Sequence, residues 1–168
     1  MQKFITFIKH EKFQPSDFKK VECFILSADL TADFKQKFAF NAQKEGKLVL
    51  STSSMDCVTY GLDGVLLDLS KSENIHGDYE NAVKSLKNKF VGVICRNRRH
   101  EAMLCSECEP DFVAFRAWQD GADKIRELTS WYAEMFLIQC ALLPMEKVDY
   151  ASFVTDFVIL DDEICVTL

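Results

Sequence analysis

The stretch KLVLSTSSMDCVTYGLDGVLLDL, residues 47–69, decides the fold class. It begins with an apolar run, Lys47–Leu50. A short segment of helical character, Ser54–Tyr60, follows and is ended by Gly61, and a second apolar run covers Gly64–Leu69. Near-continuous apolar runs are typical of strands that are buried on both faces, as in parallel sheets. The stretch therefore predicts one strand–helix–strand unit.

The same alternation continues in both directions along the chain. Runs rich in Val, Ile and Phe predict eight strands, at Phe4–Ile8, Val21–Leu26, Lys47–Leu50, Gly64–Leu69, Phe90–Cys95, Phe112–Phe115, Ile138–Leu143 and Phe157–Leu160. The spacing of apolar residues predicts helices at Ala32–Glu45, Ser54–Tyr60, Tyr79–Leu86, Arg99–Cys108, Asp123–Phe136 and Val148–Val154. Strands that alternate with helices indicate an α/β protein with a parallel sheet.

Two architectures fit this alternation: an open doubly wound sheet and a closed (β/α)8 barrel. Eight units favour the barrel, although 168 residues is short against the roughly 200–250 that are typical. The missing length falls at the ends, because His10–Lys20 has room for only a turn or two of helix and only Asp161–Leu168 follows the last run. We therefore predict a single domain over residues 1–168. It is a trimmed TIM barrel with a short first connection, little or no eighth helix, and a thin outer wall beside its first and last strands.

The composition limits the classes of function. The formal net charge is −6, which argues against nucleic-acid binding because phosphate contacts need a basic face. No apolar run reaches the ~18 residues of a membrane span, and the N-terminal apolar stretch is too interrupted for a signal peptide. We expect a cytoplasmic protein with neither nucleic-acid nor membrane partners.

Cysteine usage points to the same compartment. The chain has seven cysteines, an odd number, and no export signal, so we interpret them as reduced thiols. Cys105 and Cys108 have the spacing of a redox or metal motif, but no second Cys or His pair accompanies them. We expect these two residues to lie one turn apart on a buried helix face.

About two-thirds of the chain, from Lys47 to Ile164, resembles the thiamine-phosphate synthases and their TenI-like relatives. Leu48-Val49-Leu50, a short helix and Gly61-Leu62-Asp63-Gly64-Val65 resemble the family's third strand, helix and "GADGVHLG" strand. Its fifth and sixth strands are similar to Val91-Gly92-Val93 and Pro110-Asp111-Phe112-Val113-Ala114-Phe115. The segment Trp131-Tyr132-Ala133-Glu134-Met135-Phe136 is similar to a divergent branch of the family, and Asp156–Leu160 is similar to the family's eighth strand.

The resemblance implies a (β/α)8 barrel that joins a pyrimidine pyrophosphate to a thiazole phosphate and releases pyrophosphate, with Mg²⁺. Departure of pyrophosphate needs a hard cation held by carboxylates, and the thiazole phosphate needs backbone amides of glycines. The positions that match these groups carry other residues in this chain. At the metal site, Ser51 and Thr52 replace Asn-Asp, and Ser70 and Lys71 lie where a second metal carboxylate is needed, with Asp68 close by. At other positions, Ile94 replaces a serine and Arg116 replaces a glycine. Leu142-Leu143-Pro144 replaces a Gly-Gly pair, and Leu26-Ser27-Ala28-Asp29 replaces the Gln/Arg/Lys side chains that bind phosphate. We therefore expect no Mg²⁺ or other cofactor, and a parent activity that is lost or strongly altered.

The functional surface of such a barrel lies at the C-terminal ends of its strands. The candidates for anion binding at this rim are Ser27, Ser51, Thr52, Arg96, Asn97 and Arg116, and the rim acids are Asp29, Asp68, Asp161 and Asp162. Two interpretations stay open. Either Arg96 and Arg116 grip a phosphate or carboxylate, or the arginines pair with the acids and the rim is occluded. No catalytic residue is assigned.

Two functions from different classes follow from this rim. The first is a degenerate thiamine-phosphate-synthase-like transferase that takes a small phosphorylated ligand. The second is a non-catalytic barrel that acts as a dimeric or regulatory interaction module. We also expect a homodimer, because half of the apolar side chains of Phe4–Ile8 and Phe157–Leu160 point outward beneath the thin wall. Left in water, they would expose more apolar area than soluble monomers usually do.

Overall fold

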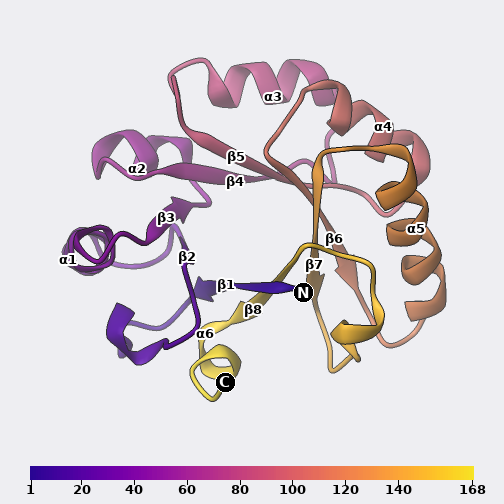
Figure 1. The fold of residues 1–168 in the computed structure, drawn as a ribbon. Coiled ribbons are helices and arrows are strands. Elements are labelled where there is room, and N and C mark those ends of the chain that lie inside the picture. Colours follow the sequence, from indigo (N-terminus) through magenta and orange to yellow (C-terminus); the bar gives the residue numbers. More distant parts are fainter.

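The computed structural model describes all 168 residues and closes eight parallel strands into a barrel with helices around its outside (Figure 1). The strands are β1 (Lys3–Ile8), β2 (Cys23–Leu26), β3 (Leu48–Ser51), β4 (Gly64–Asp68), β5 (Phe90–Ile94), β6 (Phe112–Ala117), β7 (Gln139–Pro144) and β8 (Phe157–Asp161). Each strand pairs with the next along the chain, and β8 pairs with β1 from Lys3 to Phe7. The predicted (β/α)8 barrel is confirmed.

The outer layer consists of six α-helices and two short 3-10 helices. They are η1 (Pro15–Asp17), α1 (Ala32–Lys44), α2 (Ser54–Thr59), α3 (Ile75–Val83), α4 (Arg99–Glu107), α5 (Ala122–Met135), η2 (Tyr150–Ser152) and α6 (Asp162–Cys165). As predicted, the connection from β1 to β2 holds only η1, and α6 has four residues. None of the helices has both the length and the apolar character needed to cross a membrane.

Two helices differ from the sequence prediction. The third begins at Ile75 rather than Tyr79, because the side chain of Asn74 caps it by accepting a hydrogen bond from the N–H of Gly77 (3.2 Å). The helix predicted at Val148–Val154 is wrong, since only η2 forms there. The side-chain amide of Gln2 donates to the carbonyl oxygens of Tyr150 (3.1 Å) and Phe153 (3.2 Å). These carbonyls are therefore bonded to the residue before β1 instead of to a further helical turn.

The core has an inner and an outer layer. A small cluster fills the barrel and includes Ile5, Ile25, Leu50, Leu66, Ile94, Phe112, Ala114, Ala141 and Ile159. A cluster of 30 buried residues lies between the strands and the helices. Gly64 lets β4 approach β5 closely, because a Cβ at this position would lie 2.2 Å from the backbone oxygen of Phe90.

Three aspartates fasten successive pairs of strands at the N-terminal end of the barrel. Asp63, Asp111 and Asp156 each lie directly before an even-numbered strand. Their carboxylates accept the backbone N–H groups of Val49 (2.8 Å), Val91 (2.7 Å) and Cys140 (2.9 Å) in the preceding strand. Each aspartate also donates its own N–H to the carbonyl of that same residue. These double bonds fix β3 to β4, β5 to β6 and β7 to β8, and we call them the aspartate clamps.

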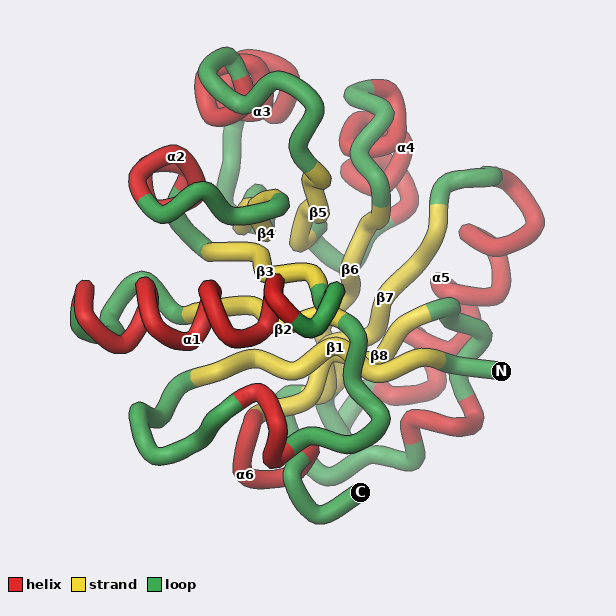
Figure 2. The backbone as a smooth tube through the Cα atoms, turned by 60° about the vertical axis from the view of Figure 1, so that its left-hand side comes forward, coloured by secondary structure: helices red, strands yellow, loops and turns green.

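The wall beside β1 and β8 is thin, but it does not expose the apolar surface that the sequence suggested. The outward side chains of Thr6, Ile8, Val158 and Leu160 are at most 4% exposed. Cys165 of α6 contacts the hydroxyl of Thr6 (2.9 Å), and α6 lies against β1 and β8 (Figure 2). Phe18 of the first connection is also fully buried. This correction removes the argument for a dimer through the thin wall, and the oligomeric state itself stays a prediction.

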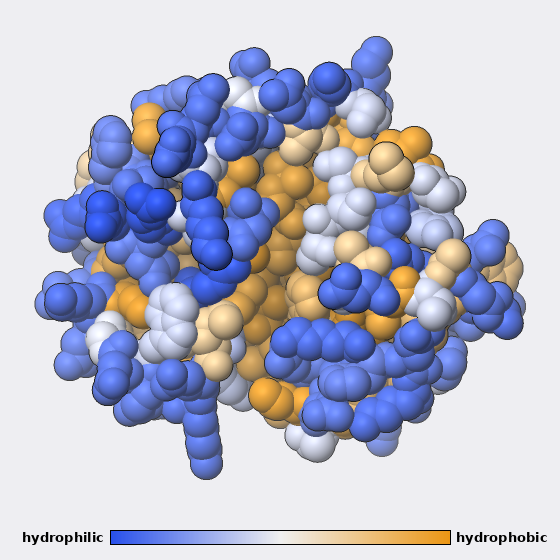
Figure 3. All heavy atoms as spheres, turned by 180° about the vertical axis from the view of Figure 1, so that it is seen from behind, coloured by the Kyte–Doolittle hydropathy of each residue, from blue (hydrophilic) through white to orange (hydrophobic).

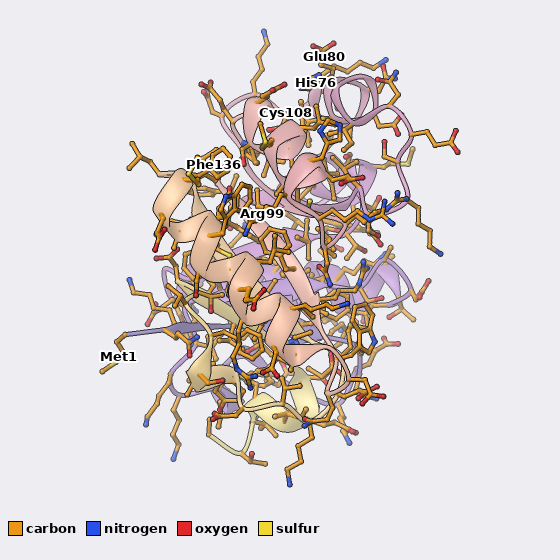
Figure 4. All side chains as sticks on the ribbon, turned by 90° about the vertical axis from the view of Figure 1, so that its right-hand side faces the viewer. Met1, His76, Glu80, Arg99, Cys108 and Phe136 are labelled. Atoms are coloured by element: carbon orange, nitrogen blue, oxygen red, sulfur yellow. The ribbon has the colours of Figure 1, made fainter.

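The two cysteines with motif-like spacing lie in different environments. Cys105 is fully buried on the inner face of α4, but Cys108 at the end of this helix is partly exposed beside α3, near His76 and Glu80 (Figure 4). Both cysteines pack against the same core cluster, but the face that they share is fully buried only at Cys105. Burial, together with the charges of neighbouring groups that include Glu107 and Glu80, raises the pKa of the Cys108 thiol to about 11, so the thiol is protonated at neutral pH.

The aspartate clamps carry a prediction about stability. Asp63→Ala, Asp111→Ala and Asp156→Ala should each lower the free energy of unfolding by about 1–3 kcal/mol, because each leaves a backbone N–H without its acceptor. Glu22→Ala is the matched control: Glu22 lies directly before β2, yet its side chain makes no such bond, so its effect should stay within about 0.5 kcal/mol. Urea unfolding of the four variants measures this, and losses no larger than that of Glu22→Ala would contradict it.

Candidate functional site at the barrel mouth

The end of the barrel that carries the strands' C-termini is seen in Figure 3. In Figure 1 the strands follow one another clockwise, and right-handed crossovers then place their N-terminal ends toward the viewer. Figure 3 views the molecule from behind, and it shows an apolar hollow bordered by hydrophilic side chains. We call this end the mouth.

A cavity of about 380 Å³ opens at the mouth and reaches into the barrel. Its inner wall is apolar and includes Phe7, Leu66, Ile94 and Ile159. The polar residues at its edge are Lys9, Thr52, Asp68, Arg116 and Asp161. This combination of an apolar floor and a few polar groups is usual for small-molecule sites.

A compact cluster of Asp68, Ser70 and Arg116 lies at one side of this cavity. Arg116 donates from Nη2 to Asp68 Oδ2 (2.8 Å) and from Nη1 to Ser70 Oγ (2.9 Å). The hydroxyl and the N–H of Ser70 both donate to Asp68 Oδ1 (2.6 and 3.0 Å). Burial alone would raise the pKa of Asp68, but these hydrogen bonds and the charge of Arg116 outweigh it and lower that pKa. Asp68 is therefore a carboxylate held by a guanidinium at neutral pH.

A second, more open cavity of about 650 Å³ adjoins the first over the ends of β4, β5 and β6. The two cavities share Asp68, Arg116 and Met145. Four cations line the second cavity against a single acid: Lys71, Arg96, Arg98 and Arg116 face Asp68. Its electrostatic character is therefore cationic, although the chain as a whole is acidic.

Arg96 has weaker contacts with acids than the other guanidinium that the sequence singled out. Its Nε donates to the carbonyl of Ser70 (3.1 Å), and its nearest carboxylate, on Glu101, is 3.9 Å away. Neighbouring Asn97 donates from Nδ2 to the carbonyl of Arg116 (2.8 Å), whereas its buried Oδ1 has no partner. The two predicted interpretations thus divide between the arginines. Arg116 pairs closely with a rim acid, whereas Arg96 has only a long ion pair with Glu101, which is not one of the rim acids.

The three predicted hydroxyl residues shape loops. Ser27 accepts from the N–H of Asp29 (3.3 Å), Ser51 from that of Ser53 (3.0 Å), and Thr52 from that of Ala28 (3.1 Å). Ser51 is fully buried, whereas Thr52 lines the mouth cavity. Of the three, the structure brings only Thr52 to the site.

The remaining rim acids have separate roles. Asp161 forms an ion pair with Lys9 (3.1 Å) at the edge of the mouth, and Asp29 is exposed without an ion pair. Asp162 is fully buried and accepts from the N–H groups of Lys9 (2.8 Å) and His10 (2.9 Å). The His10 ring lies 2.8 Å from the same carboxylate. Asp162 therefore ties the end of β1 to α6 and does not face the cavity.

The donor set at the mouth does not suit Mg²⁺. The carboxylate of Asp68 is already bound by Arg116 and Ser70, and the lysine and arginines beside it would repel a cation. The hydroxyls of Ser51 and Thr52 accept backbone N–H groups. No group of three or more His, Cys, Asp or Glu side chains gathers in a metal-binding arrangement.

Lys9 and Lys71 line these cavities and were missed as site residues in the sequence. A signal for both was present, because each follows a predicted strand by one or two residues. The pairing of Arg116 with Asp68 is one of the pairs that the occluded-rim interpretation allowed, although β5 separates the two strands that carry these residues.

Comparisons with known proteins support the fold and part of the family resemblance. No protein-family model matches the chain. A curated thiamine-phosphate synthase from Erythrobacter litoralis is 30% identical in an alignment that covers 44% of this chain and 41% of that protein. The match thus spans only about two-fifths of the relative's length.

Three solved structures with a similar fold come from enzymes of other kinds. A citrate synthase variant has a TM-score of 0.65 at 12% identity, covering 99% of this chain and 89% of its own. The YdjI aldolase of Escherichia coli K12 has 0.61 at 11% (95% and 75%). A 3-keto-L-gulonate-6-phosphate decarboxylase of Vibrio cholerae has 0.60 at 9% (96% and 88%). At these identities the likeness shows the fold alone, which is that of a TIM barrel.

Asp162 provides a prediction about pH. Burial would raise its pKa, but the hydrogen bonds from His10, Lys9 and Glu163 outweigh that effect and lower the pKa. A lowered folded-state pKa adds stability that is fully present above the unfolded value of about 3.9 and is lost as the pH falls through the folded value. Asp162→Asn, whose amide N–H₂ would face these donors, should lower the free energy of unfolding at pH 7 by about 1–3 kcal/mol. Urea unfolding should show the gap to the unmodified protein constant from pH 7 to 5 and shrinking below about pH 4; a gap that does not change with pH would refute the assignment.

Proposed function

We propose that this chain is a divergent thiamine-phosphate-synthase-like barrel that binds a small phosphorylated ligand at its mouth and does not perform the Mg²⁺-dependent coupling of that family. The ion pair between Arg116 and Asp68 carries the proposal. Asp68 is the carboxylate nearest to the position where the family would need a metal ligand, and it is bound by the guanidinium of Arg116. The mouth thereby becomes a site for anions rather than for cations.

The two adjoining cavities argue for a ligand with two parts. The apolar cavity inside the barrel suits an uncharged ring or short aliphatic group, because its inner wall includes Leu66, Ile94 and Ile159. The cationic cavity beside it suits a phosphate, since Arg96 and Arg116 present planar guanidinium groups with several N–H donors each. A phosphate monoester of a small ring compound would place one part in each cavity.

The coupling chemistry itself lacks support at this site. Release of pyrophosphate requires that the charge of the leaving group is neutralised. In the thiamine-phosphate synthases, a metal ion held by carboxylates supplies this neutralisation. Here Pro144 lies in β7 where the family has glycines, and Thr52 and Ser51 lie where it has Asn-Asp. The function therefore reduces to recognition of a phosphorylated compound.

Ligand binding is tested with inorganic phosphate and thiamine monophosphate by calorimetry and thermal shift. A ligand at 100 times its dissociation constant should stabilise the protein by about 2.7 kcal/mol. The double variant Arg96→Ala/Arg116→Ala should lose this stabilisation. The double variant Lys37→Ala/Lys44→Ala removes the same amount of charge from the outer helix α1 and should keep it. Stabilisation that survives in the first variant, or is absent from the unmodified protein, would overturn the anion site.

The absence of coupling is tested separately. With pyrimidine pyrophosphate, thiazole phosphate and Mg²⁺, the protein should release no pyrophosphate above the uncatalysed background. The two carboxylates that line the mouth cavity are already paired, Asp68 with Arg116 and Asp161 with Lys9. A pyrophosphate-release assay measures this, with an active thiamine-phosphate synthase as the positive control. Mg²⁺-dependent turnover near the median enzyme rate of about 10 s⁻¹ would contradict it.

A further inference from the structure

We propose that the N-terminal end of the barrel, opposite the mouth, holds a second binding site that accepts an uncharged, largely aromatic small molecule. A cavity of about 550 Å³ opens at this end among the first residues of the strands. Its volume falls within the roughly 300–1,000 Å³ of ligand pockets. The two cavities lie at opposite ends of the barrel and share no lining residue.

The walls of this cavity are apolar and partly aromatic. Ile5, Leu50 and Phe112 form its buried floor. The rings of Phe112 and Phe157 meet edge to face with centroids 5.8 Å apart. Leu48 and Phe90 complete the wall and remain 37% and 45% exposed. Apolar surface exposed to water is unfavourable in free energy. A ligand that covers the apolar wall of this cavity removes that surface from water, and this burial favours binding.

The cavity exists because the side chain of Phe112 does not fill the centre of the barrel at this end. A Cβ on Gly92 would lie 2.1 Å from the ring of Phe112, so that ring rests against the backbone of β5 instead of crossing the barrel. No helix covers this end, and Met1, at the edge of the cavity, projects away from the barrel into solvent (Figure 4). The centre of the barrel end is therefore left open.

The charges around the opening favour an uncharged ligand. Lys3 and Lys20 are balanced by Glu22 and Asp111, and none of the four takes part in an ion pair. A charged molecule would meet one attractive and one repulsive pair. The exposed side-chain amide of Gln139 has no partner and offers one donor and one acceptor to a polar group at the ligand's outer end. The recognition chemistry is thus an aromatic body with a single neutral polar group.

The neutral probe N-phenyl-1-naphthylamine, which fluoresces strongly only in apolar surroundings, tests the site. Titration into the full chain should give saturable, blue-shifted emission with one probe bound per protein. Leu48→Glu and Phe90→Glu each place a charge in the wall at a partly exposed position, and each should weaken binding at least tenfold. Leu137→Glu changes a fully exposed apolar residue outside the cavity and should leave binding unchanged.

Three measurements distinguish binding in this cavity from binding at the mouth, from dimerisation and from non-specific adsorption. Probe binding should persist in Arg96→Ala/Arg116→Ala and in saturating phosphate, so failure of the mouth site and failure of this one are distinguishable. Light scattering during the titration should give the same mass for the unmodified protein and for the two wall variants. A doubled mass that falls in the two wall variants would show that a second copy covers the cavity, and would overturn the proposal. Emission that does not saturate, or wall variants that bind as well as Leu137→Glu, would overturn it too, with urea midpoints showing that each variant is folded.

Discussion

Closure of the sheet between β1 and β8 is the constraint on which the rest of the structure depends. These two strands pair from Lys3–Phe157 to Phe7–Asp161, which satisfies the backbone groups that an open sheet would leave at its edges. Closure also brings eight strand ends around one small opening. Lys9, Asp68, Arg116 and Asp161 come from four strands or strand ends, and only the ring makes them neighbours. The mouth, its cation cluster and the cavity at the other end are all consequences of this ring.

Much of the fold was available from the sequence because buried parallel strands are nearly continuous apolar runs. All eight runs became strands, and the shortfall in length lies where the sequence placed it, in the first connection and after β8. The errors have local physical causes. Asn74 supplies a cap that starts α3 early, and Gln2, some 150 residues away, binds the carbonyls that a helix after β7 would have used. The aspartate clamps also have a signal in the sequence, because an Asp recurs directly before β4, β6 and β8.

The site was less predictable because its chemistry depends on distances between strands that are not adjacent. Sequence reasoning placed Arg96, Asn97, Arg116 and Asp68 at the rim, but which arginine meets an acid depends on the tilt and register of β4 through β6. The hydroxyls of Ser27 and Ser51 accept hydrogen bonds from backbone N–H groups two residues further on, and so they shape loops instead of facing a ligand. The cavity at the N-terminal end has no sequence signature at all, since it results from where the ring of Phe112 comes to rest.

The pairing of the first strand with the last also sets an order of events during synthesis. The ring cannot close until β8 has been made, so the nascent chain passes through a stage with at most seven strands and two open edges. Contacts between residues so distant in sequence form slowly, because the entropy of the long loop must be lost first. The aspartate clamps act within neighbouring pairs and can form as each pair emerges. They give the growing sheet local fastenings during the interval in which it is most open to association with other chains.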